Sequence, residues 1–280
     1  MQEAETRQER AIEAALQVAA SFGVAAHVPE ILHDSNNTVI HLSPAPIVAK
    51  VRTTPSQRRS FQSELGIGLY PADQDALAVR PSREIPPVLH MYDGLELTFW
   101  EWCPHDPGVE VDGRKAGHAL RRLHDALAGY AGRLPSYTRD LEEVGSILAR
   151  EETLQSLDRS DKAFLREVHE TGYAPLEART LAIQPLHGEA HLGNLLASAD
   201  GPRWIDFEAA CIGPPEWDFA SLPDEALDAF PNVDLELLRH LRLVHHLCVA
   251  VWCWLNPDRD PILRLHGEIH LEALRDGHQW

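Results

Sequence analysis

Two short segments in the C-terminal half constrain the fold more than any other part of this chain of 280 residues. The first covers residues 187–194 (HGEAHLGN), and the second covers residues 205–208 (IDFE). Residues 195–197 and 203–205 between them are strand-like, and the turn-forming sequence Ser-Ala-Asp-Gly-Pro separates the two runs. The sequence therefore predicts a β-hairpin that turns at Asp200.

The polar residues that flank this hairpin suggest a chemistry. Asn194 and Asp206 lie symmetrically about Asp200, so the hairpin is expected to bring both side chains to its open end. Mg²⁺ accepts such hard oxygen ligands and keeps coordination positions for phosphate oxygens. Glu189 precedes this ligand pair and can act as a base. A base and two metal ligands are the parts needed for phosphoryl transfer to a hydroxyl.

The two segments, continued by residues 213–220 (GPPEWDFA), resemble the catalytic and metal-binding segments of the aminoglycoside phosphotransferase family. The resemblance implies a protein-kinase-like α+β fold with two lobes, a small antiparallel β lobe and a larger, mainly helical C-terminal lobe. Residues 1–103 would form the nucleotide-binding lobe and end in a hinge. Residues 104–280 would hold the catalytic loop, the metal site and the substrate pocket.

One position departs from the family pattern. Glu189 stands where the family usually has aspartate, which keeps the acid but moves the carboxylate by one methylene. A pseudokinase that binds nucleotide or ligand without turnover therefore stays open as an alternative to an active kinase. A metabolic kinase for a small amine or amino alcohol is a separate alternative that does not depend on this substitution.

A zinc site is a third interpretation of the same residues. His187 and His191 flank Glu189, and residues 265–271 (LHGEIHL) nearly repeat the pattern. Zinc sites need a third or fourth ligand, and the zinc deaminase signature needs a later Cys-x-x-Cys that this sequence lacks. The magnesium interpretation is therefore favoured.

The N-terminal part reads as a helix followed by a small sheet. Apolar residues at helical spacing predict a helix over residues 6–22, and short β-like runs follow at 30–33, 38–42 and 47–51. Polar turn residues separate the first two runs. In the family this turn lies over the nucleotide phosphates, which implies that Ser35, Asn36 and Asn37 contact them.

Lys50 ends an apolar strand, where a lone ammonium is costly unless it is exposed or paired. Residues 54–57 (TPSQ) look like a helix N-cap, a proline at the first helical position and a capping-box glutamine, so the following helix would carry Glu64 back across the sheet. A strand lysine with a helix glutamate resembles the kinase ion pair that holds the nucleotide phosphates.

The composition turns from strands to helices near residue 103. Residues 88–92 and 95–102 read as the last two strands, and Glu101, Trp102 and Cys103 would form the adenine-binding hinge. Helical patterns follow at 113–130, 139–150 and 161–170.

The net charge of −18 argues against nucleic acid as a partner and favours a cationic one. Residues 204–238 contain no Lys or Arg. The candidate substrate-binding residues are acidic positions of this stretch and one aromatic residue of the apolar segment after it: Glu208, Glu216, Asp224, Glu225, Asp228 and Trp252.

No run of eighteen apolar residues occurs, and the first residues lack the features of a signal peptide. The four cysteines have no zinc spacing and no disulfide framework. The sequence therefore predicts a cytoplasmic protein with free thiols and no membrane partner. With the family resemblance, the expected activity is phosphorylation of a hydroxyl on a small cationic molecule, with ATP or GTP and Mg²⁺. The leading substrate is an antibiotic, either an aminoglycoside or a basic cyclic peptide of the tuberactinomycin kind, and the reaction would confer resistance.

Overall fold

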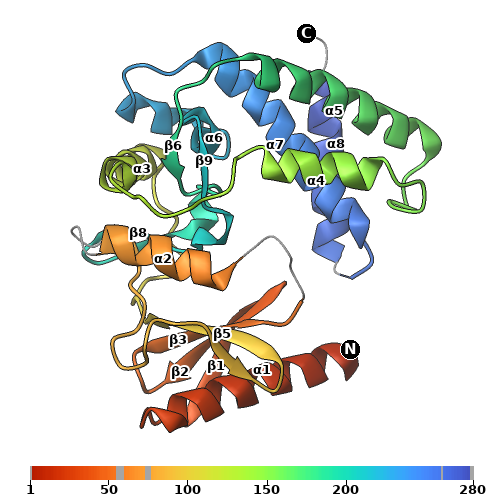
Figure 1. The fold of residues 1–280 in the computed structure, drawn as a ribbon. Helices are drawn as coiled ribbons and strands as arrows, with labels where there is room; N and C mark the ends of the chain where they lie inside the picture. The colour runs from red at the N-terminus through yellow and green to blue at the C-terminus, as the bar shows by residue number, and fades with distance from the viewer. Residues whose placement is uncertain (1, 55–59, 73–76, 260, 278–280) are drawn as a thin grey trace. The chain divides into compact units, whose positions relative to one another are not determined.

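The computed structural model describes residues 2–54, 60–72, 77–259 and 261–277, and Figure 1 shows the ribbon. The chain packs as two compact units. Unit 1 consists of Met1–Leu134 with His187–Ala210, and unit 2 consists of Pro135–Leu186 with Cys211–Trp280. The division into lobes at residue 103 stays a prediction, because these units group the chain by packing, whereas the lobes are defined by the nucleotide site.

Unit 1 contains a five-stranded antiparallel sheet with the strand order β1-β2-β3-β5-β4. Its strands are β1 (Val28–Asp34), β2 (Asn37–Ser43), β3 (Ile47–Arg52), β4 (His90–Tyr92) and β5 (Leu95–Glu101). All five strands were predicted from alternation and turn residues, with ends that differ by one or two residues. The predicted antiparallel N-terminal sheet is therefore confirmed.

Side-chain alternation gives the sheet two different faces. On one face, the apolar residues Ile40, Ala49 and Leu97 are buried against helix α1 (Gln2–Ser21), which lies along the sheet in Figure 1. The helix contributes small residues such as Ala11, which let its backbone approach the strands. The opposite face carries polar and bulky side chains and borders the pocket described below.

The remaining described elements of unit 1 are α2 (Phe61–Ala72), α3 (Gly113–Leu127), the 3₁₀ turns η1 (Leu192–Asn194) and η2 (Phe207–Ala209), and the hairpin β7 (Leu195–Ser198) with β8 (Gly201–Trp204). The predicted helix start at residues 54–57 falls largely outside the described residues, and the described part of that helix begins at Phe61. Asp112 caps α3, because its carboxylate accepts hydrogen bonds from the backbone N–H groups of Arg114 and Lys115.

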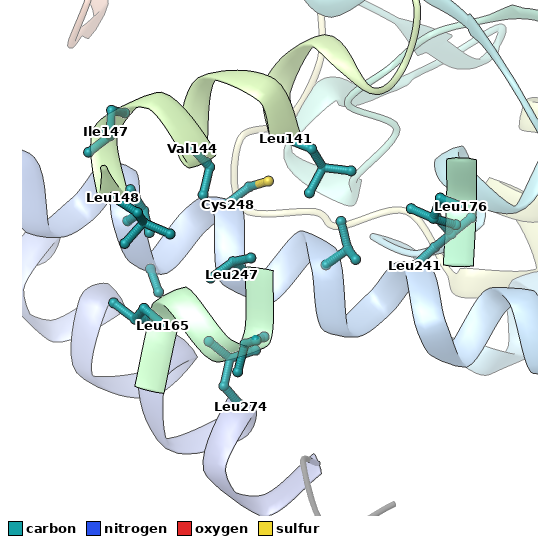
Figure 2. Close-up of a cluster of buried hydrophobic side chains, with 14 of the residues drawn as sticks. Leu141, Val144, Ile147, Leu148, Leu165, Leu176, Leu241, Leu247, Cys248 and Leu274 are labelled. Carbon is teal, nitrogen blue, oxygen red and sulfur yellow. The ribbon is translucent and has the colours of Figure 1, made fainter. Parts of the chain in front are cut away.

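Unit 2 is mainly helical, as predicted. It contains α4 (Arg139–Leu148), α5 (Arg159–Ala178), β6 (Gln184–Leu186), β9 (Cys211–Gly213), α6 (Glu216–Phe219), the 3₁₀ helix η3 (Asp224–Ala229), α7 (Leu235–Leu255) and α8 (Pro261–Gly277). Figure 2 shows its apolar core, where side chains such as Leu141, Leu165, Leu247 and Leu274 meet. The four cysteines are free thiols. Within the described part of the chain, no helix combines the length and apolar character that a membrane span requires.

A histidine pair between α7 and α8 makes the stability of unit 2 dependent on pH. The Nδ1 atoms of His246 and His270 lie 2.8 Å apart, with Arg242, His245 and His266 nearby. Burial lowers the pKa of His246, and the nearby Arg242 lowers it further. Burial, followed by the three neighbouring histidines, lowers the pKa of His270 from 6.5 to about 4. Between these two values the unfolded chain binds protons that the folded chain does not, so acid favours unfolding.

We therefore expect the free energy of unfolding to fall as the pH drops from about 6.5 towards 4. Urea unfolding at pH 7 and pH 5 measures this loss in the wild type and in His270→Gln, which keeps a polar side chain but does not titrate. The variant should lose less stability between the two pH values. Equal losses would contradict a contribution from this pair.

Candidate active site

A pocket of about 570 Å³ lies within unit 1, on the face of the sheet opposite to α1. Lys50, Glu64, Glu189, Asn194 and Asp206 line one part of it, together with the three predicted hinge residues. Its apolar wall consists of Leu32, Val39, Val48, Val79, Leu196 and Ile205. The structure therefore brings together eight of the predicted site residues from strands, a helix and two loops. The sequence reasoning did not single out the apolar wall, although strand alternation places Val39 and Val48 on the same face as Lys50.

Lys50 is at the centre of the polar part. Its side chain is 8% exposed, and its Nζ lies 2.8 Å from Glu64 Oε1, 2.9 Å from Asp206 Oδ1 and 2.6 Å from Glu208 Oε1. The predicted pairing with Glu64 is present, and two further carboxylates join it. These contacts tie β3 to α2 and to the segment that follows β8.

Three carboxyl groups surround the buried ammonium of Lys50. Burial by itself lowers the pKa of Lys50, but Asp206, Glu64 and Glu208 outweigh that effect and raise it, so the ammonium stays charged. Burial, reinforced by Asp206 and Glu208, raises the pKa of Glu64 to about 8 despite the contact with Lys50. Glu64 Oε2 is buried without a hydrogen-bond partner among the described residues. The raised pKa of Glu64 indicates that the three carboxyl groups are not readily ionised together, and a further cation in the pocket would favour their ionised forms.

Asn194 and Asp206 both line the pocket, but the hairpin brings them there in a register that differs from the prediction. The turn is tight and centres between Ala199 and Asp200, because Ser198 pairs with Gly201 and Leu195 with Trp204. Ile205, rather than Asp206, lies opposite Asn194 and donates its N–H to the Asn194 carbonyl at 3.0 Å. The prediction that Asn194 and Asp206 lie symmetrically about Asp200 was therefore wrong, because the residue opposite Asn194 is Ile205, one position earlier.

The backbone conformation of Asp206 compensates for this shift. Asp206 has φ 64° and ψ 66°, in the left-handed region that aspartate and asparagine tolerate better than most residues. Asn194 donates from Nδ2 to the Glu189 carbonyl at 3.0 Å, so its amide oxygen is the side-chain atom that could contact a metal ion. An amide oxygen and a carboxylate that line one pocket are ligand types that fit Mg²⁺.

The loop that carries Glu189 is held by a buried histidine. His187 is fully buried, and its Nε2 donates to the Ile205 carbonyl at 2.9 Å while its Nδ1 accepts from the Glu189 backbone N–H at 3.3 Å. These two bonds define a neutral ring that braces the loop against the end of the hairpin. Gly188 has φ +88°, and a Cβ there would lie 2.0 Å from the Ala209 carbonyl oxygen, so only glycine fits before Glu189.

The predicted hinge residues Glu101, Trp102 and Cys103 also line the pocket. Glu101 and Trp102 donate their backbone N–H groups to the carbonyls of Arg80 and Pro46, each at 2.8 Å. The Trp102 indole stacks on His41 with ring centroids 4.1 Å apart. The Cys103 carbonyl accepts from His105 Nδ1 at 2.8 Å. These contacts fix the segment after β5 and make its backbone part of the pocket rim.

Glu208 lies in unit 1 and is 4% exposed, so its environment differs from that of a surface residue that attracts a cationic substrate. Its carboxylate accepts a 2.5 Å hydrogen bond from Asn37 Nδ2 and contacts Arg52 Nη2 at 3.3 Å, besides the contact with Lys50. Arg52 also contacts Glu96 at 2.9 Å. The sequence reasoning missed Arg52, although its position two residues after Lys50 places it on the same face of β3.

The β1–β2 turn was expected to contact phosphates. Ser35, Asn36 and Asn37 do not line the pocket, but the turn connects the pocket-lining residues His33 and Val39. The backbone of Asn36 accepts from Thr53 and Thr54, and Asn37 joins Glu208. The turn therefore borders the Lys50 end of the pocket.

The other predicted substrate residues belong to unit 2. Asp224, Glu225 and Asp228 are exposed on η3, and Asp224 forms an ion pair with Arg242 at 2.7 Å. Glu216 is buried and accepts from the Asp234 backbone N–H at 3.1 Å, which ties α6 to the start of α7. The partly buried Trp252 packs against the helical core. The three acidic residues of η3 are therefore exposed to solvent, whereas Glu216 and Trp252 take part in the packing of unit 2.

The comparisons with known proteins identify the family of this chain. A profile of the phosphotransferase enzyme family matches residues 27–252. No curated protein matches the chain in sequence.

Solved structures with the same fold span nearly the whole chain. Amicoumacin kinase hAmiN, in complex with AMP-PNP, Ca²⁺ and its ligand, has a TM-score of 0.70 at 13% identity and covers 98% of this chain and 96% of its own. The GDP and kanamycin complex of APH(2")-IIia has a TM-score of 0.69 at 15% identity, and the match covers 95% of this chain and 98% of its own. A choline/ethanolamine kinase family protein from Mesorhizobium loti has a TM-score of 0.67 at 15% identity, and the match covers 96% of this chain and 94% of its own.

These similarities confirm the protein-kinase-like fold, and the profile match extends over most of the chain. The chain therefore belongs to the phosphotransferase enzyme family and is a small-molecule kinase that transfers a phosphoryl group to a hydroxyl.

Proposed function

We propose that this kinase uses Mg²⁺ and ATP or GTP to phosphorylate a hydroxyl of a small cationic antibiotic, either an aminoglycoside or a basic cyclic peptide of the tuberactinomycin kind, and so confers resistance. The observation that supports the chemistry is a single pocket lined by Lys50, Asn194, Asp206 and Glu189. It combines a charged ammonium, two hard oxygen ligands and a carboxylate. Phosphoryl transfer relies on such positioning and charge neutralisation.

The roles of the residues follow from their contacts. Lys50 would bind the nucleotide phosphates, which replace part of its carboxylate shell, while Glu64 keeps its ammonium in place. Asn194 and Asp206 would hold Mg²⁺, and the bound ion neutralises negative charge on the phosphates. Residues 101–103 would contact the base through backbone groups other than the two N–H groups and the carbonyl that are already bonded, and the apolar wall would enclose the base.

Glu189 would act on the acceptor. Glu189 is partly buried and lines the pocket, and the brace through His187 limits the movement of its backbone. In the proposed step, the substrate oxygen attacks the terminal phosphorus, the bond to the leaving nucleotide oxygen breaks, and the hydroxyl proton passes to the Glu189 carboxylate. A carboxylate that orients the hydroxyl and accepts its proton is sufficient for this role.

A metabolic kinase for a small amine or amino alcohol is the second candidate. The Mesorhizobium loti protein described as choline/ethanolamine kinase family resembles this chain in fold about as closely as amicoumacin kinase hAmiN and the kanamycin-bound APH(2")-IIia do. The substrates of both candidate classes are cationic and bear a hydroxyl, so only the identity of the acceptor separates them.

An acceptor panel tests the proposal. Purified protein with Mg²⁺ and either ATP or GTP is offered aminoglycosides, basic cyclic peptides, choline and ethanolamine, and transfer of the γ-phosphate is measured by mass spectrometry. We expect at least one antibiotic to be phosphorylated with a higher kcat/KM than either amino alcohol. Phosphorylation of choline or ethanolamine alone would replace the antibiotic proposal with the metabolic one.

The exposed acidic residues Asp224, Glu225 and Asp228 give this proposal an electrostatic consequence. We expect the KM for the cationic acceptor to rise with salt, because mobile ions screen exposed charges beyond about 8 Å at physiological ionic strength. Replacing the three by their amides should raise the KM at low salt and flatten its salt dependence. Asp258→Asn, an exposed substitution elsewhere in unit 2, is the matched control. A KM that does not change with salt would contradict capture by these charges.

A further inference from the structure

The N-terminal helix makes a polar contact with the turn that borders the nucleotide pocket. Arg7 Nη2 lies 2.6 Å from Asp34 Oδ2, and Gln8 Nε2 donates to the same oxygen at 2.9 Å. Arg7 Nη1 also donates to the Ser35 carbonyl at 3.4 Å. The Asp34 side chain is only 14% exposed and that of Arg7 is 29% exposed, so these bonds are partly shielded from water.

The second oxygen of Asp34 points back to the sheet. Asp34 Oδ1 accepts from the hydroxyl of the fully buried Thr38 at 2.8 Å. Burial of the carboxyl opposes ionisation, but the hydrogen bonds from Gln8, Thr38 and Arg7 outweigh it and lower the pKa of Asp34. Asp34 is therefore an ionised link between α1 and the start of β2.

The same turn is held at its other end by the charged cluster around Lys50. Asn37 donates to Glu208, which contacts Lys50. In the middle, the N–H of Ser35 donates to the Asn37 carbonyl at 3.0 Å, and the N–H of Thr54 donates to the Asn36 carbonyl at 3.0 Å. No glycine occurs in residues 34–37, so the turn owes its conformation to these bonds.

We propose that α1 is a positioning element of the nucleotide site, in which Arg7 and Gln8 fix Asp34 and thereby hold the β1–β2 turn beside the ammonium of Lys50. This inference rests on the proposed nucleotide function of the pocket. A turn held in its binding conformation does not have to be ordered when the ligand binds, which increases affinity. Loss of Arg7 should therefore weaken nucleotide binding without changing the chemical step.

Helix α1 also supplies a matched control. Arg10 forms an ion pair with Asp93 at 2.9 Å, but both side chains are more than half exposed and Asp93 belongs to the β4–β5 turn. Arg7→Ala and Arg10→Ala each remove one arginine and one ion pair from the same helix. Neither removes the apolar contacts that anchor it, since those come from residues such as Ala11 and Val18.

The test is titration calorimetry of the full-length protein with ADP and Mg²⁺, combined with steady-state kinetics in ATP. We expect Arg7→Ala to weaken ADP binding and raise the KM for ATP roughly tenfold, as expected for the loss of a partly buried charge-assisted hydrogen bond, with kcat within about twofold. Arg10→Ala should bind as the wild type does. In an Asp34→Ala background, Arg7→Ala should have little further effect, because the two residues act through one contact.

The outcomes separate two failures. If the wild type binds no ADP in the presence of Mg²⁺, the proposed nucleotide site itself is wrong. If the wild type binds and Arg7→Ala binds equally well, or Arg10→Ala weakens binding to the same degree, the positioning role of α1 is wrong. If Arg7→Ala melts near the assay temperature, Arg7→Lys replaces it, because lysine keeps the charge but loses the second donor group. An ADP affinity for Arg7→Lys that lies below that of the wild type would support the positioning role of α1, and wild-type affinity would contradict it.

Discussion

Replacing Asp206 by asparagine is expected to lower phosphoryl transfer by about 10³-fold or more, the range that loss of a key charge-stabilising group has in this chemistry, while the fold stays intact. The variant keeps an oxygen ligand but removes the negative charge that attracts Mg²⁺. It also removes one of the three carboxylates around Lys50, and Glu64 and Glu208 still pair with the ammonium. The structural cost should therefore be small.

Asparagine is a sharper test than alanine because of the backbone. Asp206 has φ 64°, which asparagine adopts more readily than alanine, so an alanine variant would mix strain with loss of the ligand. Asp200→Asn makes the same chemical change at an exposed residue of the same hairpin and serves as the control. Turnover is measured over a Mg²⁺ titration, alongside a thermal melt. Near wild-type turnover of Asp206→Asn would refute its assignment as a metal ligand.

Glu189→Gln is expected to reduce kcat by roughly 10²- to 10⁴-fold, the usual contribution of general-base assistance, and to leave the affinity for nucleotide nearly unchanged. The amide can still accept a hydrogen bond from the hydroxyl but cannot take up its proton at neutral pH. The brace through His187 binds only the backbone of residue 189, so the loop should keep its conformation. Full activity of Glu189→Gln with a phosphorylated acceptor would show that another group takes the proton.

Glu189→Asp distinguishes a working glutamate from a lost aspartate. The shorter side chain withdraws the carboxylate by about 1.5 Å, the length of one carbon–carbon bond. If the pocket is fitted to glutamate, we expect this variant to be impaired as well. A large gain of activity in Glu189→Asp would instead identify the natural protein as a decayed or repurposed enzyme, which is the pseudokinase alternative. Comparison of the two variants on one acceptor therefore decides the role of this residue.

Local patterns predicted the secondary structure well, because they report which side of an element faces the core. Alternation in β2 and β3 requires Ile40 and Ala49 on one face and Val39 and Lys50 on the other, and the structure has this arrangement. The Lys50–Glu64 pair could be predicted for the same reason. A strand lysine that points into an apolar environment needs an acidic partner, and the next helix carries one.

The hairpin register was less accessible to sequence reasoning. Turn-forming residues extend over positions 198–202, so several turn lengths fit the sequence, and each places a different residue opposite Asn194. The pairing of Leu195 with Trp204 depends on burial of Trp204, which is fully enclosed and whose backbone bonds to that of Leu77 and Val79. Asp206 still reaches the pocket because it adopts a left-handed conformation.

The sequence by itself determined the elements, the face of the sheet that carries Lys50, and the type of chemistry, since these follow from periodicity and from residue types within a few positions. Apart from the Lys50–Glu64 pair, the tertiary structure alone decided the partners of the buried and partly buried charges. Glu208 pairs with Asn37 and Arg52, which are 171 and 156 residues away, and Arg7 pairs with Asp34 on a different element. An acidic residue has the same local pattern whether it meets solvent or a buried arginine, and only the packing of distant segments brings the opposite charge within reach.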